Sequence, residues 1–208
     1  MNNSPFAILL SAMRILMKIV DAVILFFLRT LLFVSFIVIA VILTWRLLYD
    51  KPQTKQKSSG IVKIKVTSPA FQEGKPIPKK YSCDGDDINP ALVIGGVPRE
   101  AKSLALILDD PDGPAGVWTH WLIWNLAPST RKIKEHVAYK GLVPGTNSGG
   151  KIEYSGPCPP EGTHHYYFRI YALDTTLELP QGVSRTFLEE AMKDHVIGKG
   201  SLMGTYSR

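Results

Sequence analysis

The sequence predicts an all-β globular domain with a C-terminal helix, preceded by an N-terminal transmembrane helix. A long apolar run lies within the first 60 residues, whereas residues 61–208 hold 16 Gly and 13 Pro, which suits short strands and tight turns. A length of 208 residues allows one ordinary domain and one further segment. The 45% hydrophobic and 20% charged residues exclude a disordered chain.

Residues 29–49 form the predicted membrane anchor. From Thr30 to Trp45 the chain has 16 consecutive uncharged residues, and Arg29 and Arg46 can extend their charges towards lipid headgroups. A span needs about 20 residues, so this stretch is long enough. The alternative is a secretory signal peptide, but the run begins late and no small-residue cleavage site follows it. We therefore expect a retained, single-pass membrane anchor.

The segments beside the anchor are predicted to lie outside the bilayer core. Residues 1–28 are apolar-rich but contain Arg14, Lys18 and Asp21, which favours an amphipathic helix at the interface. Residues 50–60 are polar and predict a linker, so residues 61–208 should form the folded domain. Basic residues flank both ends of the anchor, and we expect the globular domain on the extracytoplasmic side.

The net charge of +6 is concentrated in the N-terminal part. Residues 1–60 carry 7 basic and 2 acidic side chains, and residues 61–208 carry 17 and 16. A protein surface that follows a phosphate backbone needs clustered positive charge. The nearly neutral domain therefore argues against nucleic acid as its partner.

Four segments of the domain have the length and composition of strands. Residues 61–67 alternate apolar and polar side chains, 103–108 form a short apolar run, and 118–126 and 164–173 are rich in aromatic and β-branched types. One segment, 186–195, reads as a helix, because its first residues have capping-box spacing and a Gly follows its end.

Strand alternation places four polar side chains in rows of apolar ones. Asp110 continues the leucine row of its strand, His120 lies in a row with Trp118, Leu122, Trp124 and Leu126, and His164 and Tyr166 begin an inward row. Each lies near a strand end, which predicts a pocket with apolar walls and converging polar groups. The alternatives are hydrogen-bonded core histidines and, at Asp110 and Asp112, simple turn formers.

These residues stand in segments that resemble the phosphatidylethanolamine-binding protein family, in its bacterial and archaeal branch related to Raf kinase inhibitor protein. The segments are Ile77-Pro-Lys-Lys-Tyr-Ser-Cys-Asp-Gly85, Asp109-Asp-Pro-Asp-Gly-Pro114, Trp118-Thr-His-Trp121, Gly156-Pro-Cys-Pro-Pro160, Gly162-Thr-His-His-Tyr166 and Leu202-Met-Gly-Thr-Tyr206. The resemblance covers residues 61–208 and does not extend to the N-terminal part.

The resemblance implies an antiparallel β-sandwich-like domain that binds phosphate, phosphorylethanolamine, acetate-like anions or a phospholipid head group. The ligand-binding residues it implies are Asp110, His120, His164, Tyr166, Gly156 and Pro157, with Asp112 and Trp118 in support. It also implies a cis peptide before Pro114. The chain departs from the family pattern at His165, where Arg is usual, and at Asn89-Pro-Ala91, where a double Pro is common.

Other chemistries fit these residues less well. Residues 145–152 nearly match a phosphate-binding loop, but Ile152 cannot ligate magnesium. Two imidazoles and a carboxylate can bind a metal, yet their wide separation in sequence is a weak signal, and we predict neither metal nor cofactor. No base is evident beside Ser155 or Thr163, so we predict a binding protein, with a regulatory role, and not an enzyme. The alternatives are a protease or kinase inhibitor acting through surface loops and a His/Asp-dependent hydrolase.

Cys83 and Cys158 are the only cysteines. They can form a disulfide if the domain faces an oxidising compartment, or remain two thiols beside the pocket. The sequence leaves both alternatives open.

Overall fold

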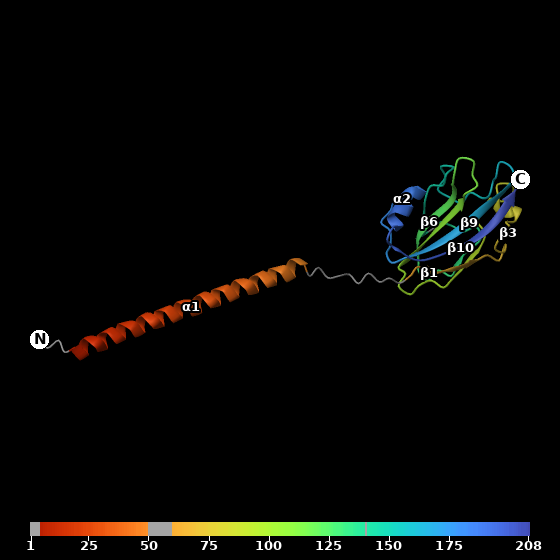
Figure 1. Ribbon diagram of the computed structural model, residues 1–208. Helices are drawn as coiled ribbons and strands as arrows, with labels where there is room; N and C mark the ends of the chain where they lie inside the picture. The colour runs from red at the N-terminus through yellow and green to blue at the C-terminus, as the bar shows by residue number, and fades with distance from the viewer. Residues whose placement is uncertain (1–4, 50–59, 140) are drawn as a thin grey trace. The chain divides into compact units, whose positions relative to one another are not determined.

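The computed structural model describes residues 5–49, 60–139 and 141–208 (Figure 1). The chain divides into two compact units, Met1–Lys57 and Ser58–Arg208. The second unit coincides closely with the predicted domain. Most of the predicted linker, residues 50–59, lies outside the described residues.

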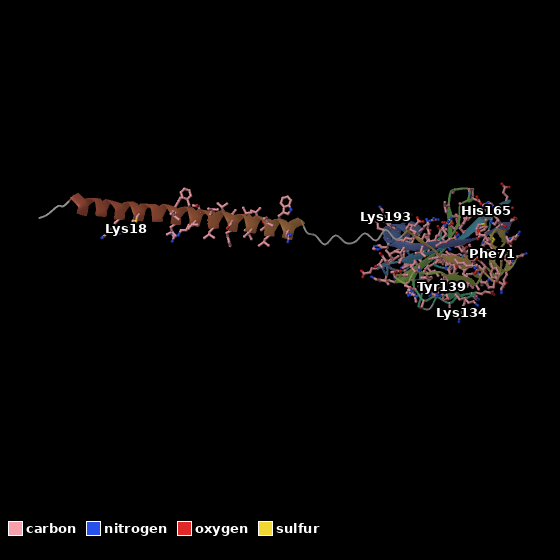
Figure 2. All side chains as sticks on the ribbon, turned by 60° about the horizontal axis from the view of Figure 1, so that its bottom comes forward. Lys18, Phe71, Lys134, Tyr139, His165 and Lys193 are labelled. Carbon is pink, nitrogen blue, oxygen red and sulfur yellow. A yellow bond between two sulfur atoms is a disulfide. The ribbon has the colours of Figure 1, made fainter. Side chains whose placement is uncertain are left out.

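The described residues of the first unit form one helix, α1 (Pro5–Tyr49). Within it, Ile24–Arg46 is long and apolar enough to cross a membrane, with a mean hydropathy of 2.7. The described side chains of this stretch project outward and are exposed (Figure 2). The helix runs without a break through the boundary predicted at residues 28 and 29, and the placement of either part in a bilayer stays a prediction.

Polar side chains within the apolar stretch of α1 bond to its own backbone. The hydroxyl of Thr30 donates to the Phe27 carbonyl at 2.8 Å, that of Ser35 to Leu32 at 2.8 Å, and that of Thr44 to Ala40 at 2.9 Å. Such bonds to a preceding turn satisfy a hydroxyl without water. The three polar residues are therefore compatible with an apolar environment.

The second unit contains two β-sheets and two short helices. Its strands are β1 (Val62–Lys63), β2 (Lys65–Thr67), β3 (Lys75–Pro76), β4 (Leu92–Gly95), β5 (Ser103–Asp110), β6 (Trp118–Leu126), β7 (Lys132–Ile133), β8 (Val143–Pro144), β9 (Thr163–Leu173) and β10 (Val196–Ser207). The helices are the 3₁₀ helix η1 (Lys79–Tyr81) and α2 (Arg185–Met192). The large sheet has the order β1-β10-β9-β5-β6-β8, with β3 also on β10, and the small sheet has the order β2-β4-β7.

The large sheet is mixed, which corrects the prediction of an antiparallel architecture. Its long central strands are antiparallel, but β1 and β3 both pair with β10 in parallel. Each of these two strands is only two residues long, and each lies on β10 as the chain passes its edge. Short edge strands of this kind have no distinct pattern in the sequence.

The predicted C-terminal helix is followed by the longest strand of the domain, so it is not the last element. Helix α2 begins after Ser184 and ends at Met192, whereas the sequence predicted a start at Thr186 and an end near His195. Strand β10 then contains three glycines, a composition that weakens strand signals. Gly198, predicted to terminate the helix, lies within β10.

The large sheet is covered on both faces, which explains why every residue of β5 is buried. One face, with Leu106 and Phe168, packs with Ile94 of the small sheet, and we call this cluster the first core. The other face, with Ile107 and Trp124, packs against α2, and we call it the second core.

Candidate functional site

Three strand ends meet at one end of the large sheet. Strand β5 lies between β6 and β9 and is antiparallel to both, so its last residue, Asp110, lies beside the first residues of its neighbours. A cavity of about 400 Å³ opens there. It is lined by Asp110, Gly113, Pro114, Ala115, Trp118, His120, Ser155, Gly156, Cys158, Pro159, Pro160 and His164.

The structure brings together the four polar residues that the sequence singled out. Asp110, His120 and His164 line the cavity. Tyr166 is fully buried, with its ring centroid 5.3 Å from that of His120 and 6.5 Å from that of His164. Gly156 lines the cavity as predicted, whereas Pro157 is not part of its lining and instead accepts a hydrogen bond from the Cys83 amide at 3.1 Å.

A β-bulge places His120 in this pocket. Leu108 pairs with Trp121 and Asp109 pairs with Thr119, so His120 is the extra residue on β6. Bulges of this kind turn a side chain away from strict alternation. The predicted row of His120 holds for Trp118, which lines the same cavity, and is wrong for Leu122 and Trp124. These two belong to the second core, while His120 lies near Tyr166 of the first core.

Asp110 and His164 form a buried hydrogen-bonded pair. The Oδ2 atom of Asp110 accepts from Nδ1 of His164 at 2.7 Å, and its Oδ1 accepts from the amide of Asp112 at 2.8 Å. A carboxylate can only accept, so Nδ1 of His164 carries the hydrogen. Nε2 of His164 is the ring nitrogen left for a ligand.

His120 is held by a backbone carbonyl. Its Nδ1 donates to the Ser155 carbonyl oxygen at 2.8 Å, while Nε2 is buried and has no hydrogen-bond partner among the described residues. Burial lowers the pKa of the imidazole, and the Ser155 carbonyl and the Asp110 carboxylate oppose that shift only in part. The ring is thus favoured in its neutral form.

The phenol of Tyr166 is a further buried polar group. Its Oη has no hydrogen-bond partner within the described part of the chain. Burial raises the pKa of the phenol, and the negative charge of Asp110 raises it further. Tyr166 therefore stays protonated and can donate a hydrogen bond.

The predicted support of the pocket by Asp112 has a structural basis in His165. The Oδ2 atom of Asp112 accepts from both the amide and Nδ1 of His165, at 2.8 and 2.7 Å. The hydrogen bond from the imidazole lowers the pKa of the Asp112 carboxyl. His165, at the position where the resemblance leads us to expect Arg, thus holds the loop whose amide binds Asp110.

The rim of the cavity is apolar. Trp118 is 41% exposed and stands beside Pro114, Ala115, Pro159 and Pro160. The expected cis bond before Pro114 is absent, since the described residues contain no cis peptide. The turn closes through a hydrogen bond from the Gly116 amide to the Gly113 carbonyl at 2.9 Å.

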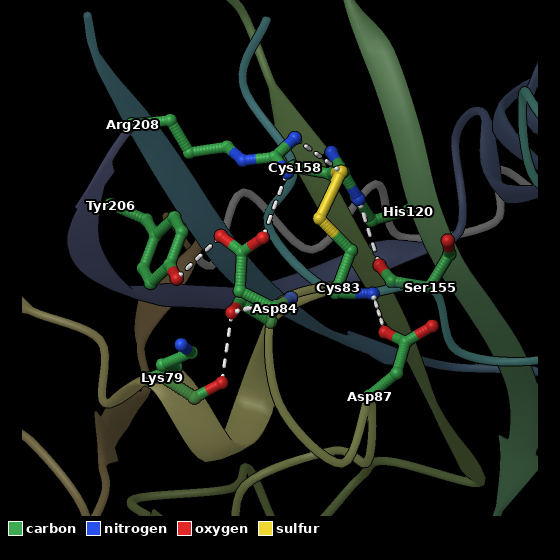
Figure 3. Close-up of a disulfide and its surroundings, with 11 residues drawn as sticks. Lys79, Cys83, Asp84, Asp87, His120, Ser155, Cys158, Tyr206 and Arg208 are labelled. Carbon is green, nitrogen blue, oxygen red and sulfur yellow. Dashed lines mark hydrogen bonds and ion pairs between the residues drawn. A yellow bond between two sulfur atoms is a disulfide. The ribbon is translucent and has the colours of Figure 1, made fainter. Parts of the chain in front are cut away.

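A disulfide joins Cys83 to Cys158, with the Cα atoms 5.5 Å apart, which decides between the two alternatives left by the sequence. Cys158 lines the cavity, so the bridge ties the segment after η1 to the pocket rim. Figure 3 shows Asp84 beside the bridge, where it contacts Tyr206 and Arg208. The rim is thereby attached to the segment after η1, which in turn contacts the end of the chain.

Sequence reasoning missed two residues of the site. Asp87 accepts a hydrogen bond from the Gly156 amide at 2.6 Å and so positions the rim. Ser155 attracted attention for its hydroxyl, whereas its carbonyl is the group that holds His120. Neither role leaves a local signal, because the partners are 69 and 35 residues apart in the chain.

The fold and site define a class of small β-proteins with one pocket at the strand ends, and comparisons with known proteins agree. The model of the phosphatidylethanolamine-binding protein family matches residues 67–207. A UPF0098 protein of Methanothermobacter thermautotrophicus is 50% identical over 144 residues, which cover 67% of this chain and 95% of the relative. A UPF0098 protein of Chlamydia muridarum is 47% identical over 150 residues, 70% of this chain and 99% of the relative.

Solved structures show the same similarity. The crystal structure of CT736 from Chlamydia trachomatis, described as a putative phosphatidylethanolamine-binding protein homologue, has a TM-score of 0.67 and 46% identity and covers 72% of this chain and 99% of that one. The structure of Escherichia coli YbcL, described as a member of the mammalian family, has a TM-score of 0.66 and 26% identity, with coverages of 70% and 98%. This chain belongs to the phosphatidylethanolamine-binding protein family.

Proposed function

We propose that the domain binds small oxyanions, such as phosphate or phosphorylethanolamine, in the pocket at the strand ends. Membership of the family supports a binding function. The observation that carries the proposal is a pair of buried polar atoms, His120 Nε2 and Tyr166 Oη, which have no hydrogen-bond partner among the described residues and belong to side chains at a cavity of about 400 Å³. Buried polar groups are normally hydrogen-bonded, so such atoms favour a polar ligand.

We also infer binding without catalysis. Among the described residues, neither pocket imidazole is hydrogen-bonded to a serine or threonine hydroxyl, because His120 bonds to a carbonyl and His164 to a carboxylate. Nucleophilic catalysis needs a base within reach of its nucleophile. The arrangement supports a rigid set of groups that hold a ligand.

The proposal includes an anchor. We infer that α1 spans a membrane and tethers a sandwich-like domain whose two sheets share the first core. The disulfide supports an extracytoplasmic location, because disulfides persist in oxidising compartments. A phospholipid head group and a free phosphate compound offer the same chemistry to the pocket.

Thermal unfolding of the fragment 58–208 tests the function. The relatives of Methanothermobacter thermautotrophicus and Chlamydia muridarum are covered to 95% and 99% by the match to this domain, which supports independent folding of the fragment. A saturating ligand at 100 times its Kd stabilises by about 2.7 kcal/mol. For a fragment of this size, we expect phosphate or phosphorylethanolamine to raise the Tm by roughly 5–11 °C.

The variants His120→Ala and His164→Ala should lose this shift. His195→Ala is the matched control, because His195 is exposed and bonds to Asp174 outside the pocket. An unchanged Tm of the parent fragment in millimolar ligand would contradict the proposal.

A further inference from the structure

We propose that His120 makes the pocket selective for oxyanions that carry a proton, so that hydrogen phosphate binds in preference to sulfate at neutral and alkaline pH. The inference rests on the proposed function, since it concerns the ligand of the same pocket. It assigns a specificity-determining role to one ring nitrogen.

The hydrogen bond to Ser155 fixes the tautomer of His120. The Ser155 carbonyl oxygen, 2.8 Å from Nδ1, can only accept, so Nδ1 carries the hydrogen. A neutral imidazole has a single N–H group, and Nε2 therefore presents a lone pair. This nitrogen is buried and without a partner among the residues described. The cavity wall thus contains a fixed acceptor.

The imidazole of His120 stays neutral in the ligand-free pocket. Asp110 on β5 and Asp87 after η1 face it with carboxylates, and His164 and Tyr166 approach it from β9. Both carboxylates already accept other hydrogen bonds, Asp110 from His164 and Asp87 from Gly156. Burial lowers the pKa of the ring despite these charges. In the ligand-free pocket, Nε2 is therefore an acceptor at neutral pH.

Sulfate and hydrogen phosphate have the same shape but differ in their ability to donate a hydrogen bond. Sulfate and hydrogen phosphate are tetrahedral and carry the same charge above neutral pH, but only hydrogen phosphate keeps a hydroxyl. That hydroxyl donates to Nε2 and leaves another phosphate oxygen to accept from the Tyr166 hydroxyl. A sulfate oxygen would face the lone pair of Nε2 as a second acceptor, which leaves both atoms unsatisfied.

The binding of the two anions should therefore depend differently on pH. Sulfate can bind only after His120 takes a proton from solvent onto Nε2, so its complex gains one proton. Above the pKa of His120, its affinity should fall about tenfold for each pH unit. Hydrogen phosphate brings its own proton, and its affinity should stay nearly constant over the same range. The two pH slopes distinguish the mechanisms.

Isothermal titration calorimetry of fragment 58–208 provides the test, with inorganic phosphate and sulfate as probes at constant ionic strength. We expect sulfate affinity to fall by more than tenfold between about pH 7 and about pH 8.5, while phosphate changes by less than about threefold. At about pH 8.5, where free phosphate is almost entirely hydrogen phosphate, heats in buffers of different ionisation enthalpy should show uptake of nearly one proton with sulfate and almost none with phosphate. Equal slopes and equal proton uptake would overturn the inference.

A variant isolates the role of His120. The amide of His120→Gln can supply an N–H group near the position of Nε2 and does not titrate, so the sulfate slope should disappear and the two affinities should agree within about threefold. His195→Ala should keep both slopes. If the glutamine variant does not fold, proton uptake by the parent fragment still decides. Failure of both anions to bind the parent would overturn the proposed function itself, whereas sulfate binding equal to that of phosphate refutes only the selectivity.

Discussion

At the residue scale, the pocket is a chain of oriented side chains. His165 holds Asp112, the Asp112 amide holds Asp110, and Asp110 holds His164. A buried carboxylate is costly unless both its oxygens are hydrogen-bonded, and Asp110 meets that condition through two partners. The hydrogen bonds around Asp110 therefore have a structural role that does not depend on a ligand.

The pH dependence of stability is a prediction about His120. Because burial lowers its pKa in the folded state, the unfolded chain binds the proton more readily. The free energy of unfolding therefore decreases as the pH falls below the ordinary histidine pKa of about 6.5, because the unfolded chain takes up a proton there before the folded state does. We expect His120→Gln to lose less stability than the parent between about pH 7.5 and about pH 5.5.

Urea denaturation of fragment 58–208 in buffer free of oxyanions measures this difference. A glutamine variant as acid-sensitive as the parent would show that His120 is not the responsible group.

At the element scale, β10 depends on glycines that leave room for the backbone or the side chains of neighbouring segments. A Cβ added at Gly200 would lie 2.0 Å from the Ile64 carbonyl oxygen, and one added at Gly204 would lie 2.6 Å from Ile77. Strand β10 bonds to β9 along its whole length and carries both parallel edge strands. Its glycines are therefore needed for the sheet, although they obscure the strand in the sequence.

Gly200→Ala should destabilise the domain by at least about 3 kcal/mol, because the clash is with backbone that cannot rotate away. Gly95→Ala is the matched control in β4, since its Cβ would lie 3.9 Å from the nearest atom, an ordinary contact. We expect the control to change stability by less than about 1 kcal/mol. Urea midpoints of the two variants measure the effect, and similar midpoints would contradict it.

Several contacts between elements fix the pocket rim. The disulfide, the Asp87–Gly156 hydrogen bond and the Asp84–Arg208 ion pair join the segment after η1, the rim and the end of the chain. Each bond restrains a segment that has no regular secondary structure. The rim is thus held by long-range contacts, which is why the carbonyl of Ser155 can orient His120.

At the scale of the whole molecule, the two units differ in what stabilises them. The domain buries two apolar cores around one sheet, whereas the described side chains of Ile24–Arg46 are exposed. An exposed apolar helix of this length is unfavourable in water and favourable in a bilayer. The physical contrast supports separate environments for the two units.

Membrane association is the corresponding prediction. The full chain should remain in the membrane pellet after alkaline carbonate extraction, whereas fragment 58–208 should be soluble. Replacing Ile37 and Ile39 by Lys places two charges in the middle of the apolar stretch, each costing about 3 kcal/mol, and should release much of the chain. Recovery of the unmodified full chain in the soluble fraction would contradict the anchor.

Much of the site was predictable from local sequence. Asp110, His164 and Tyr166 follow the two-residue period of their strands, and the structure confirms that these rows face one core. The period failed at His120, where a bulge changes the pairing, and near Asn125, whose positive φ of 55° accompanies a second register shift. Bulges depend on the partner strand, so one strand's sequence does not reveal them.

The sequence by itself determined the all-β character of the domain, the apolar helix before it and the residue types available to the pocket, because alternation and composition act along neighbouring residues. Only the tertiary structure decided the mixed sheet, the final glycine-rich strand, the Cys83–Cys158 bridge and the burial of His120 Nε2 without a partner among the described residues. These features come from contacts between segments far apart in the chain, whose geometry exists only after the strands have paired.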